Sequence, residues 1–153
     1  MAIDATEFRR VADELAIRDL VARSADAVVR FDEKAWIECW AEDARWILGG
    51  SAAEGRDAIL SRWLMVMGTI DFVAQLPEYG MLDVSGDRAT GRWYVTELLW
   101  FKGGDPARIL GVYHDAYLRV DGAWRFEERR FDVLYTGAPD LRGQTFPYPE
   151  GLG

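Results

Sequence analysis

The stretch ARILGVYHDAYLRVDGAWRFEERRFDVLYT, residues 107–136, decides the fold class. It contains two long runs rich in aromatic and β-branched residues on either side of DG at 121–122, a dipeptide typical of a tight β-hairpin turn. The preceding run ATGRWYVTELLWFK, residues 89–102, has the same character and is followed by the turn sequence GGDP at 103–106. The three runs therefore predict a meander of three long antiparallel strands.

The chain upstream of the meander has helical patterns. An amphipathic helix is predicted over 4–29, where Asp4 and Glu7 can form a capping box. Shorter helices are predicted over 33–41 and 56–67, with a short strand at 44–48 between them. The apolar stripe predicted for the first helix comprises Phe8, Val11, Leu15, Leu20, Val21, Ala25 and Val28.

Helices followed by a meander of strands predict an α+β fold with the helices on one face of the sheet. Strands of this length are expected to curve around the helices, so that the antiparallel sheet encloses a pocket. A chain of 153 residues is expected to form one domain. We place this domain at 1–136 and expect 137–153, which contains three prolines, to be its irregular C-terminal tail.

The composition argues against several classes of function. A net charge of −8 disfavours binding to nucleic acid, which needs a basic face, and to an anionic membrane. The chain has one cysteine, Cys39, and one histidine, His114, so neither an internal disulfide nor a His/Cys metal site is expected. No glycine-rich phosphate loop, long apolar run or signal peptide is recognisable. We therefore expect a cytoplasmic protein that uses no metal and no cofactor.

Six short pieces of the sequence carry a resemblance to a known family. They are AIRDL (16–20), WAEDARW (40–46), GRDAI (55–59), DFV (71–73), GRWY (91–94) and YLRVDGAWRF (117–126). In this order they resemble the SnoaL-like branch of the nuclear-transport-factor-2-like superfamily, whose members are cone-shaped α+β barrels. The branch includes dehydratases, dehydrochlorinases, polyketide cyclases, isomerases and non-catalytic subunits, so the resemblance implies the fold more narrowly than the reaction.

The resemblance also implies where catalytic residues would lie. Many catalytic members use an Asp–His pair, whose two positions match Val29 and Asp71 here, so both members of the pair are replaced. The similarity to bile-acid dehydratases instead places a catalytic carboxylate at Glu97. The pattern of dehydratase relatives implies that His114 faces the pocket from the next strand.

Alternation along the strands extends this prediction to neighbouring residues. The same dehydratase relatives imply that Val112 faces the pocket with His114, and alternation then turns Tyr113, Asp115 and Tyr117 outward. In the last strand it points Glu127, Arg129 and Phe131 inward.

These positions predict a relocated acid/base set: Glu97 with His114, Asp71 at the mouth of the cavity, and Arg129 holding an anionic oxygen. The residues expected to contact a ligand are Trp46, Trp63, Met67, Trp93, Val112, Phe131 and Val29. Structural alternatives remain open, in which His114 is an ordinary strand histidine, Glu97 forms a salt bridge, Asp71 caps a helix exit and Arg129 pairs across the sheet.

The preferred function is a cofactor-independent lyase or isomerase, of dehydratase or cyclase type, acting on a small apolar cyclic or aromatic substrate. The alternative is a non-catalytic protein that binds a small molecule, and a less favoured one is an epoxide hydrolase. We also expect a homodimer or higher homo-oligomer, because an aromatic outer sheet face favours a partner. The residues expected on that face are Tyr94, Trp100, Tyr113 and Tyr117.

Overall fold

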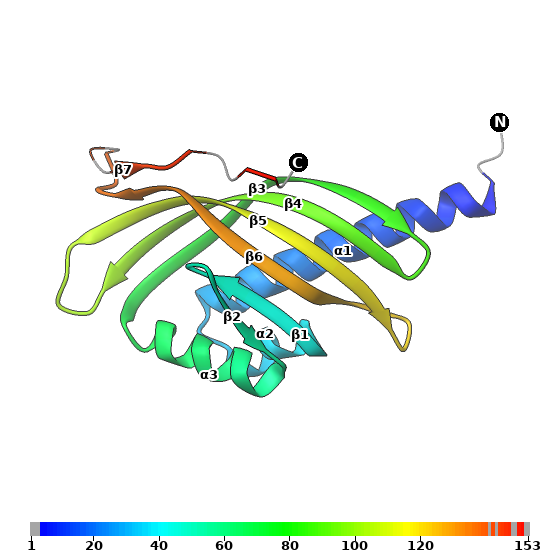
Figure 1. Ribbon diagram of the computed structural model, residues 1–153, viewed down its shortest axis with the longest axis horizontal. Helices are drawn as coiled ribbons and strands as arrows, with labels where there is room; N and C mark the ends of the chain where they lie inside the picture. Colours follow the sequence, from blue (N-terminus) through cyan, green and yellow to red (C-terminus); the bar gives the residue numbers. More distant parts are fainter. Residues whose placement is uncertain (1–3, 141, 143, 148–149, 152–153) are drawn as a thin grey trace.

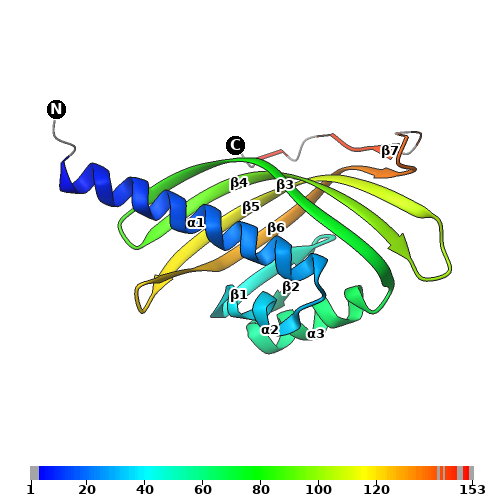
Figure 2. The same cartoon turned by 180° about the vertical axis from the view of Figure 1, so that it is seen from behind.

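The fold combines three helices with one curved sheet, which confirms the predicted α+β class. The computed structural model describes residues 4–140, 142, 144–147 and 150–151. The elements are α1 (Ala5–Val29), α2 (Glu33–Glu38), β1 (Trp40–Leu48), β2 (Ser51–Glu54), α3 (Arg56–Met67), β3 (Ile70–Ser85), β4 (Arg88–Phe101), β5 (Pro106–Val120), β6 (Ala123–Gly137) and β7 (Gln144–Thr145). The sheet arches over α1, and α2 and α3 lie below its concave side (Figures 1 and 2).

The strands follow the order β2-β1-β6-β5-β4-β3, with β7 paired to β6. The predicted meander is present as β4, β5 and β6, which pair antiparallel. The sheet is mostly antiparallel, as predicted, with one exception: β1 lies parallel to β6. The sequence reasoning also missed β2 and most of β3. The tail is not wholly irregular, since β7 pairs with Tyr135 and Thr136.

The turn between β5 and β6 has the conformation that its sequence demands. Asp121 and Gly122 both have positive φ values, 48° and 80°. A two-residue hairpin turn of this kind needs positive φ at both central positions, and Asp-Gly meets that need at low cost. The turn therefore holds β5 and β6 in one register, which decides which of their side chains face inward.

Helix α1 differs from its predicted amphipathic pattern in its first half. Asp4 accepts a hydrogen bond from the Glu7 backbone N–H at 2.8 Å, which confirms the predicted cap. Phe8, Val11 and Leu15 are exposed, which contradicts the apolar stripe that the sequence predicts for this helix. The helix begins beyond the β3–β4 turn (Figures 1 and 2), so its start projects past the sheet. Farther along, Asp13 is the side chain that contacts the sheet, and Val11 and Leu15 remain exposed.

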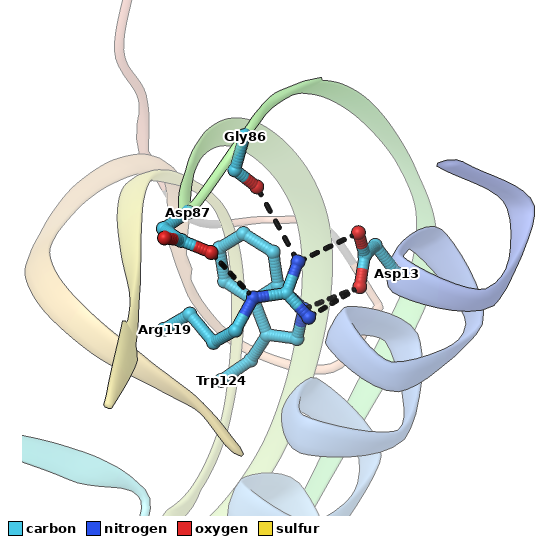
Figure 3. A network of polar contacts seen from close by, with 5 residues as sticks. All are labelled: Asp13, Gly86, Asp87, Arg119 and Trp124. Atoms are coloured by element: carbon cyan, nitrogen blue, oxygen red, sulfur yellow. Dashed lines mark hydrogen bonds and ion pairs between the residues drawn. The ribbon is translucent and has the colours of Figure 1, made fainter. Parts of the chain in front are cut away.

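The polar residue Asp13 is buried in place of that stripe. Arg119 donates to both Asp13 carboxylate oxygens at 2.8 Å and to Asp87 at 2.8 Å, as Figure 3 shows. Trp124 Nε1 donates to Asp13 at 3.2 Å, and the Arg119 guanidinium lies over the Trp124 ring. The hydrogen bonds from Arg119 hold the pKa of Asp13 below its ordinary value. This network connects α1 to the β3–β4 turn through Asp87 and to the β5–β6 hairpin through Arg119 and Trp124.

The described part of the tail lies on the convex face of the sheet (Figure 1). The Phe146 backbone N–H donates to the Leu134 carbonyl at 2.8 Å. None of the helices in the described residues is long and apolar enough to cross a membrane.

Candidate functional site

A cavity of about 190 Å³ lies between the concave face of the sheet and the segment formed by α2, β1 and α3. Its lining is largely apolar, with a few polar side chains gathered on the sheet side. Cavities of this kind, with few polar groups in an apolar wall, are the usual sites for small molecules. Two walls enclose the cavity, one formed by tryptophans and one by polar side chains.

The tryptophan wall consists of Trp36, Trp40, Trp46 and Trp63. The Trp36 ring is stacked on Trp63 at 5.0 Å and meets Trp46 edge-on at 5.4 Å, measured between centroids. Trp40 lies 5.2 Å from Trp36. All four side chains are buried. Such ring contacts fix one another's orientation, so the wall has a set shape.

Local structure explains why these rings converge. Asp32 caps α2 by accepting a hydrogen bond from the Ala35 backbone N–H at 2.9 Å. The chain then enters β1, where the Trp40 carbonyl accepts two hydrogen bonds from Arg56 at 2.6 and 2.8 Å. Arg56 begins α3, so this contact ties the helix that carries Trp63 to the start of β1.

The polar wall consists of Gln75, Glu97, Tyr113 and Arg129, which lie on the four strands β3 to β6. Gln75 and Glu97 are direct cross-strand partners, and the Gln75 amide donates to Glu97 Oε1 at 2.6 Å. Glu97 is partly accessible because it lines the cavity. Burial raises the pKa of Glu97, while the Gln75 hydrogen bond and the charge of Arg129 oppose that rise.

Arg129 is held by a buried network beneath the cavity. Its Nε donates to Asp115 at 2.9 Å, and the side chains of both residues are nearly inaccessible, at 4% and 0%. Tyr117 donates to the other Asp115 oxygen at 2.8 Å and accepts from Trp93 Nε1 at 2.8 Å.

The electrostatics of this network keep Arg129 charged. Burial alone would lower the pKa of Arg129, but the attraction of Asp115 raises it above its ordinary value. The guanidinium also lies 3.8 Å from the centroid of the Tyr113 ring. The site therefore presents a fixed positive charge beside a carboxyl group.

The structure brings together six of the residues that the sequence assigned to a site. Glu97, Arg129, Trp46, Trp63, Met67 and Phe131 all line the cavity. Two others, Val29 and Trp93, line an adjacent groove between α1 and β3.

The predicted position of His114 is wrong. Trp93 pairs with Tyr113 across β4 and β5, and opposite residues share a face of the sheet. Tyr113, Asp115 and Tyr117 therefore face inward, and His114 faces the convex side with Arg92 and Arg130 as its cross-strand neighbours. Burial lowers the pKa of His114, although Asp132 lies 3.9 Å from its Nδ1.

The same change of face corrects other predictions. Val112 is fully buried on the convex side and does not line the cavity. Tyr113 and Tyr117 do not lie on the outer face that the sequence predicts for an oligomer contact. Tyr94 and Trp100 do lie on that convex face, because they alternate with the inward-facing residues of β4.

Two predicted acids also lie outside the cavity. Asp71 is exposed at the start of β3 next to a register shift, while its neighbour Ile70 lines the cavity. Glu127 sits at the β-bulge of β6 and pairs with Arg88 at 2.6 Å. The bulge lets Phe126 and Arg129 both face inward and leaves Glu127 out.

Sequence reasoning missed Gln75, Tyr113 and Asp115 as site residues. Tyr113 and Asp115 could have been found from the register of the β4–β5 hairpin, because an inward Glu97 requires inward odd-numbered residues on β5. Gln75 carries no signal in the sequence, because the nearby Pro77 and Gly80 hide the strand pattern of its segment. Among the described residues, no group of three His, Cys, Asp or Glu side chains could hold a metal ion.

Comparisons with known proteins agree with this fold over most of the chain. A family model for the SnoaL-like domain matches residues 9–130. The gamma-hexachlorocyclohexane dehydrochlorinase of Sphingobium indicum is 28% identical over 137 residues, which cover 85% of this chain and 86% of that protein.

Solved structures of related dehydrochlorinases have the same fold. A hexachlorocyclohexane dehydrochlorinase of type 2 superimposes with a TM-score of 0.81 at 26% identity. The type 3 protein of Novosphingobium barchaimii superimposes with a TM-score of 0.79, also at 26% identity. Each alignment covers 94% of this chain and 99% of the other. Dehydrochlorinases are lyases, so the chain has homologues in that class of enzyme.

Proposed function

The chain belongs to the SnoaL-like domain family, and on that premise we propose that it is a cofactor-independent lyase or isomerase. Its substrate is a small, largely apolar ring compound. The observation that carries this proposal is the Glu97 carboxyl group, which lines an apolar cavity opposite four tryptophans and has a raised pKa. A carboxyl group desolvated in this way is a stronger base for a carbon-bound proton than one in water.

Glu97 and Arg129 have complementary roles in this reaction. The Glu97 carboxylate takes a proton from a ring carbon, and the electron pair of that bond forms a double bond. In an elimination, the leaving group departs from the neighbouring carbon with its own bonding pair, whereas in an isomerisation Glu97 returns the proton to another carbon. Arg129 stabilises the negative charge that develops on the leaving group or on an enolate oxygen.

The size of the cavity narrows the substrate class. An apolar cavity of about 150 Å³ in another protein holds benzene. The cavity here has a volume of about 190 Å³, which suits a single substituted ring. A steroid-like or polycyclic compound exceeds that space. The homologous dehydrochlorinases, named for hexachlorocyclohexane, agree with a six-membered ring as the type of substrate.

The test is turnover of a panel of halogenated cyclohexanes, hydroxylated cyclohexanones and cyclohexenones by wild type and Glu97→Gln. We expect at least one compound to be converted by the wild type and the variant to lose about 10²–10⁴-fold in kcat. The wild-type rate is expected to increase as pH rises through the pKa of Glu97. The matched control is Glu78→Gln, because Glu78 is an exposed acid on β3 that accepts a hydrogen bond from Thr96 and does not line the cavity. Equal kcat in Glu97→Gln and wild type would contradict the proposal.

The second candidate function is a non-catalytic binding protein. It is favoured by the loss of the Asp–His pair, because Val29 lies in the groove and Asp71 is exposed. Under this reading the panel compounds quench or shift tryptophan fluorescence, and none of them is converted. That result would replace the enzymatic proposal with the binding one.

A further inference from the structure

A groove of about 370 Å³ runs between α1 and β3 beside the cavity. Its floor and walls are mainly apolar side chains: Val21, Ala22, Ala25, Val29, Pro77 and Trp93. Val29 is 41% exposed, so the groove is open to solvent at this residue. The small side chains of Ala22 and Ala25 leave room between the helix and the strand.

Gln75 is the one described residue that lines both the groove and the cavity. Its side chain is 8% exposed and turns its amide to Glu97. On α1, Val28 lines the cavity and the next residue, Val29, lines the groove. The two spaces therefore meet at Gln75, directly beside the carboxyl group that the proposed reaction uses.

The segment that carries Gln75 is suited to local movement. Strand β3 lies at one edge of the sheet. Register shifts occur on both sides of Gln75, between Ile70 and Phe72 and between Pro77 and Tyr79. Irregular pairing at an edge weakens the ladder locally and lets a side chain change its direction without disturbing the central strands.

We propose that this groove is the passage through which a small apolar ligand reaches the cavity and that Gln75 is its gate. With its amide on Glu97, Gln75 closes the passage. When the side chain swings away, the ligand passes between α1 and β3 and arrives next to Glu97. The inference rests on the proposed function only in taking the cavity as the ligand-binding site. The passage itself is argued from the groove and from the position of Gln75.

The experiment measures exchange of fluorobenzene by ¹⁹F NMR line shape, which requires binding and no turnover. Val29→Trp places a large ring in the outer groove and is expected to slow association at least about tenfold. Val11→Trp is the matched control, because Val11 lies on the same helix, is 44% exposed and lines neither space. It is expected to exchange at the wild-type rate.

Two Gln75 variants separate the gate from the groove. Gln75→Ala removes the side chain between the two spaces, and Gln75→Met keeps its length but cannot donate to Glu97. Association is expected to be slowest in wild type, faster in the Met variant and fastest in the Ala variant. The same rate in all three would overturn the gate.

Phe101→Trp tests a second possible entrance, at the end of β4, where Phe101 lines the cavity and is 37% exposed. Slower association in Phe101→Trp with a wild-type rate in Val29→Trp would overturn the passage and move it to that end. Because no turnover is involved, either outcome leaves the Glu97→Gln test unaffected. Conversely, an inactive wild type with gated fluorobenzene exchange would contradict the proposed reaction alone.

Discussion

The two walls of the cavity come from different parts of the chain and are held together by different forces. The tryptophan wall lies within residues 36–63 and rests on ring-to-ring packing. The polar wall lies within residues 75–129 and rests on hydrogen bonds and a buried ion pair across four strands. Shape is thus supplied by one segment and charge by the other, and each can be changed separately.

The largest effect is expected from breaking the ion pair behind the polar wall. Asp115→Leu leaves the Arg129 guanidinium buried without its carboxylate, which costs about 3–5 kcal/mol of unfolding free energy. Urea denaturation followed by circular dichroism measures this change. The double variant Asp115→Leu/Arg129→Leu removes both charges and is expected to recover most of the loss. A loss below about 1 kcal/mol in the single variant, as for an exposed pair, would show that the pair is not buried as described.

A slightly smaller effect is expected from the tryptophan wall. Trp36→Ala removes the ring that contacts the other three and leaves a void, at a cost of about 3 kcal/mol. Because indole rings do not titrate, the loss should be the same at pH 5 and pH 8. Trp100→Ala is the control, since Trp100 is 52% exposed and its removal should change stability by about 0.5 kcal/mol or less. If the loss of unfolding free energy in Trp36→Ala varied with pH, the tryptophan wall would not rest on ring packing alone.

The third expected effect is a pH dependence of the unfolding free energy that comes from Glu97 in the polar wall. The folded-state pKa of Glu97 is raised by burial above its reference value of 4.5. The free energy of unfolding therefore decreases as pH rises from about 4.5 to the raised pKa, because the unfolded chain releases this proton at a lower pH than the folded protein. The decrease is about 1.4 kcal/mol for each unit by which the pKa is raised.

Glu97→Gln removes that dependence. Its unfolding free energy, relative to wild type, should increase between pH 4.5 and pH 8. Thermal denaturation over this range tests the expectation. A constant difference between Glu97→Gln and wild type would mean that the pKa of Glu97 is not raised.

The smallest effect is expected on the convex face. His114→Gln should leave turnover and fluorobenzene binding within twofold of wild type, because the side chain does not reach the cavity. Burial lowers the pKa of His114 below its reference value of 6.5, so the wild type loses some stability as pH falls through that range, and the variant does not. We expect a difference of about 1 kcal/mol or less. A large loss of turnover in His114→Gln would contradict the position of His114 outside the cavity.

The fold was predictable where local signals act over short distances. The Asp-Gly turn and the glycine-rich turn after β4 define the long hairpins, and capping by Asp4 and Asp32 defines two helix starts. Strand β3 escaped prediction because Pro77 and Gly80 interrupt its pattern. The parallel pairing of β1 with β6 escaped because no local pattern records a contact between distant segments.

The inward position of Glu97 on β4 and those of Arg129 and Phe131 on β6 were predictable. The prediction was wrong for Glu127, which lies at the β6 bulge, and for His114 and Val112 on β5. The position of His114 was transferred from relatives, whereas the hairpin register links Tyr113 to Trp93 and decides the face physically. Gly111 is a sequence signal that supports this register, because a Cβ there would lie 2.2 Å from the Phe131 ring. A glycine within a strand often marks such a close approach on the inward face.

The pairing of β1 with β6 also bears on how the protein folds. Arg45 and Glu128, which are cross-strand partners, are 83 residues apart in the chain. Contacts of such separation form slowly, because a long loop must close before the pairing stabilises anything. The hairpins of β4, β5 and β6 are local by comparison. We therefore expect refolding to build the meander first and to dock the tryptophan-bearing segment onto β6 last, so that the cavity does not exist until the final step.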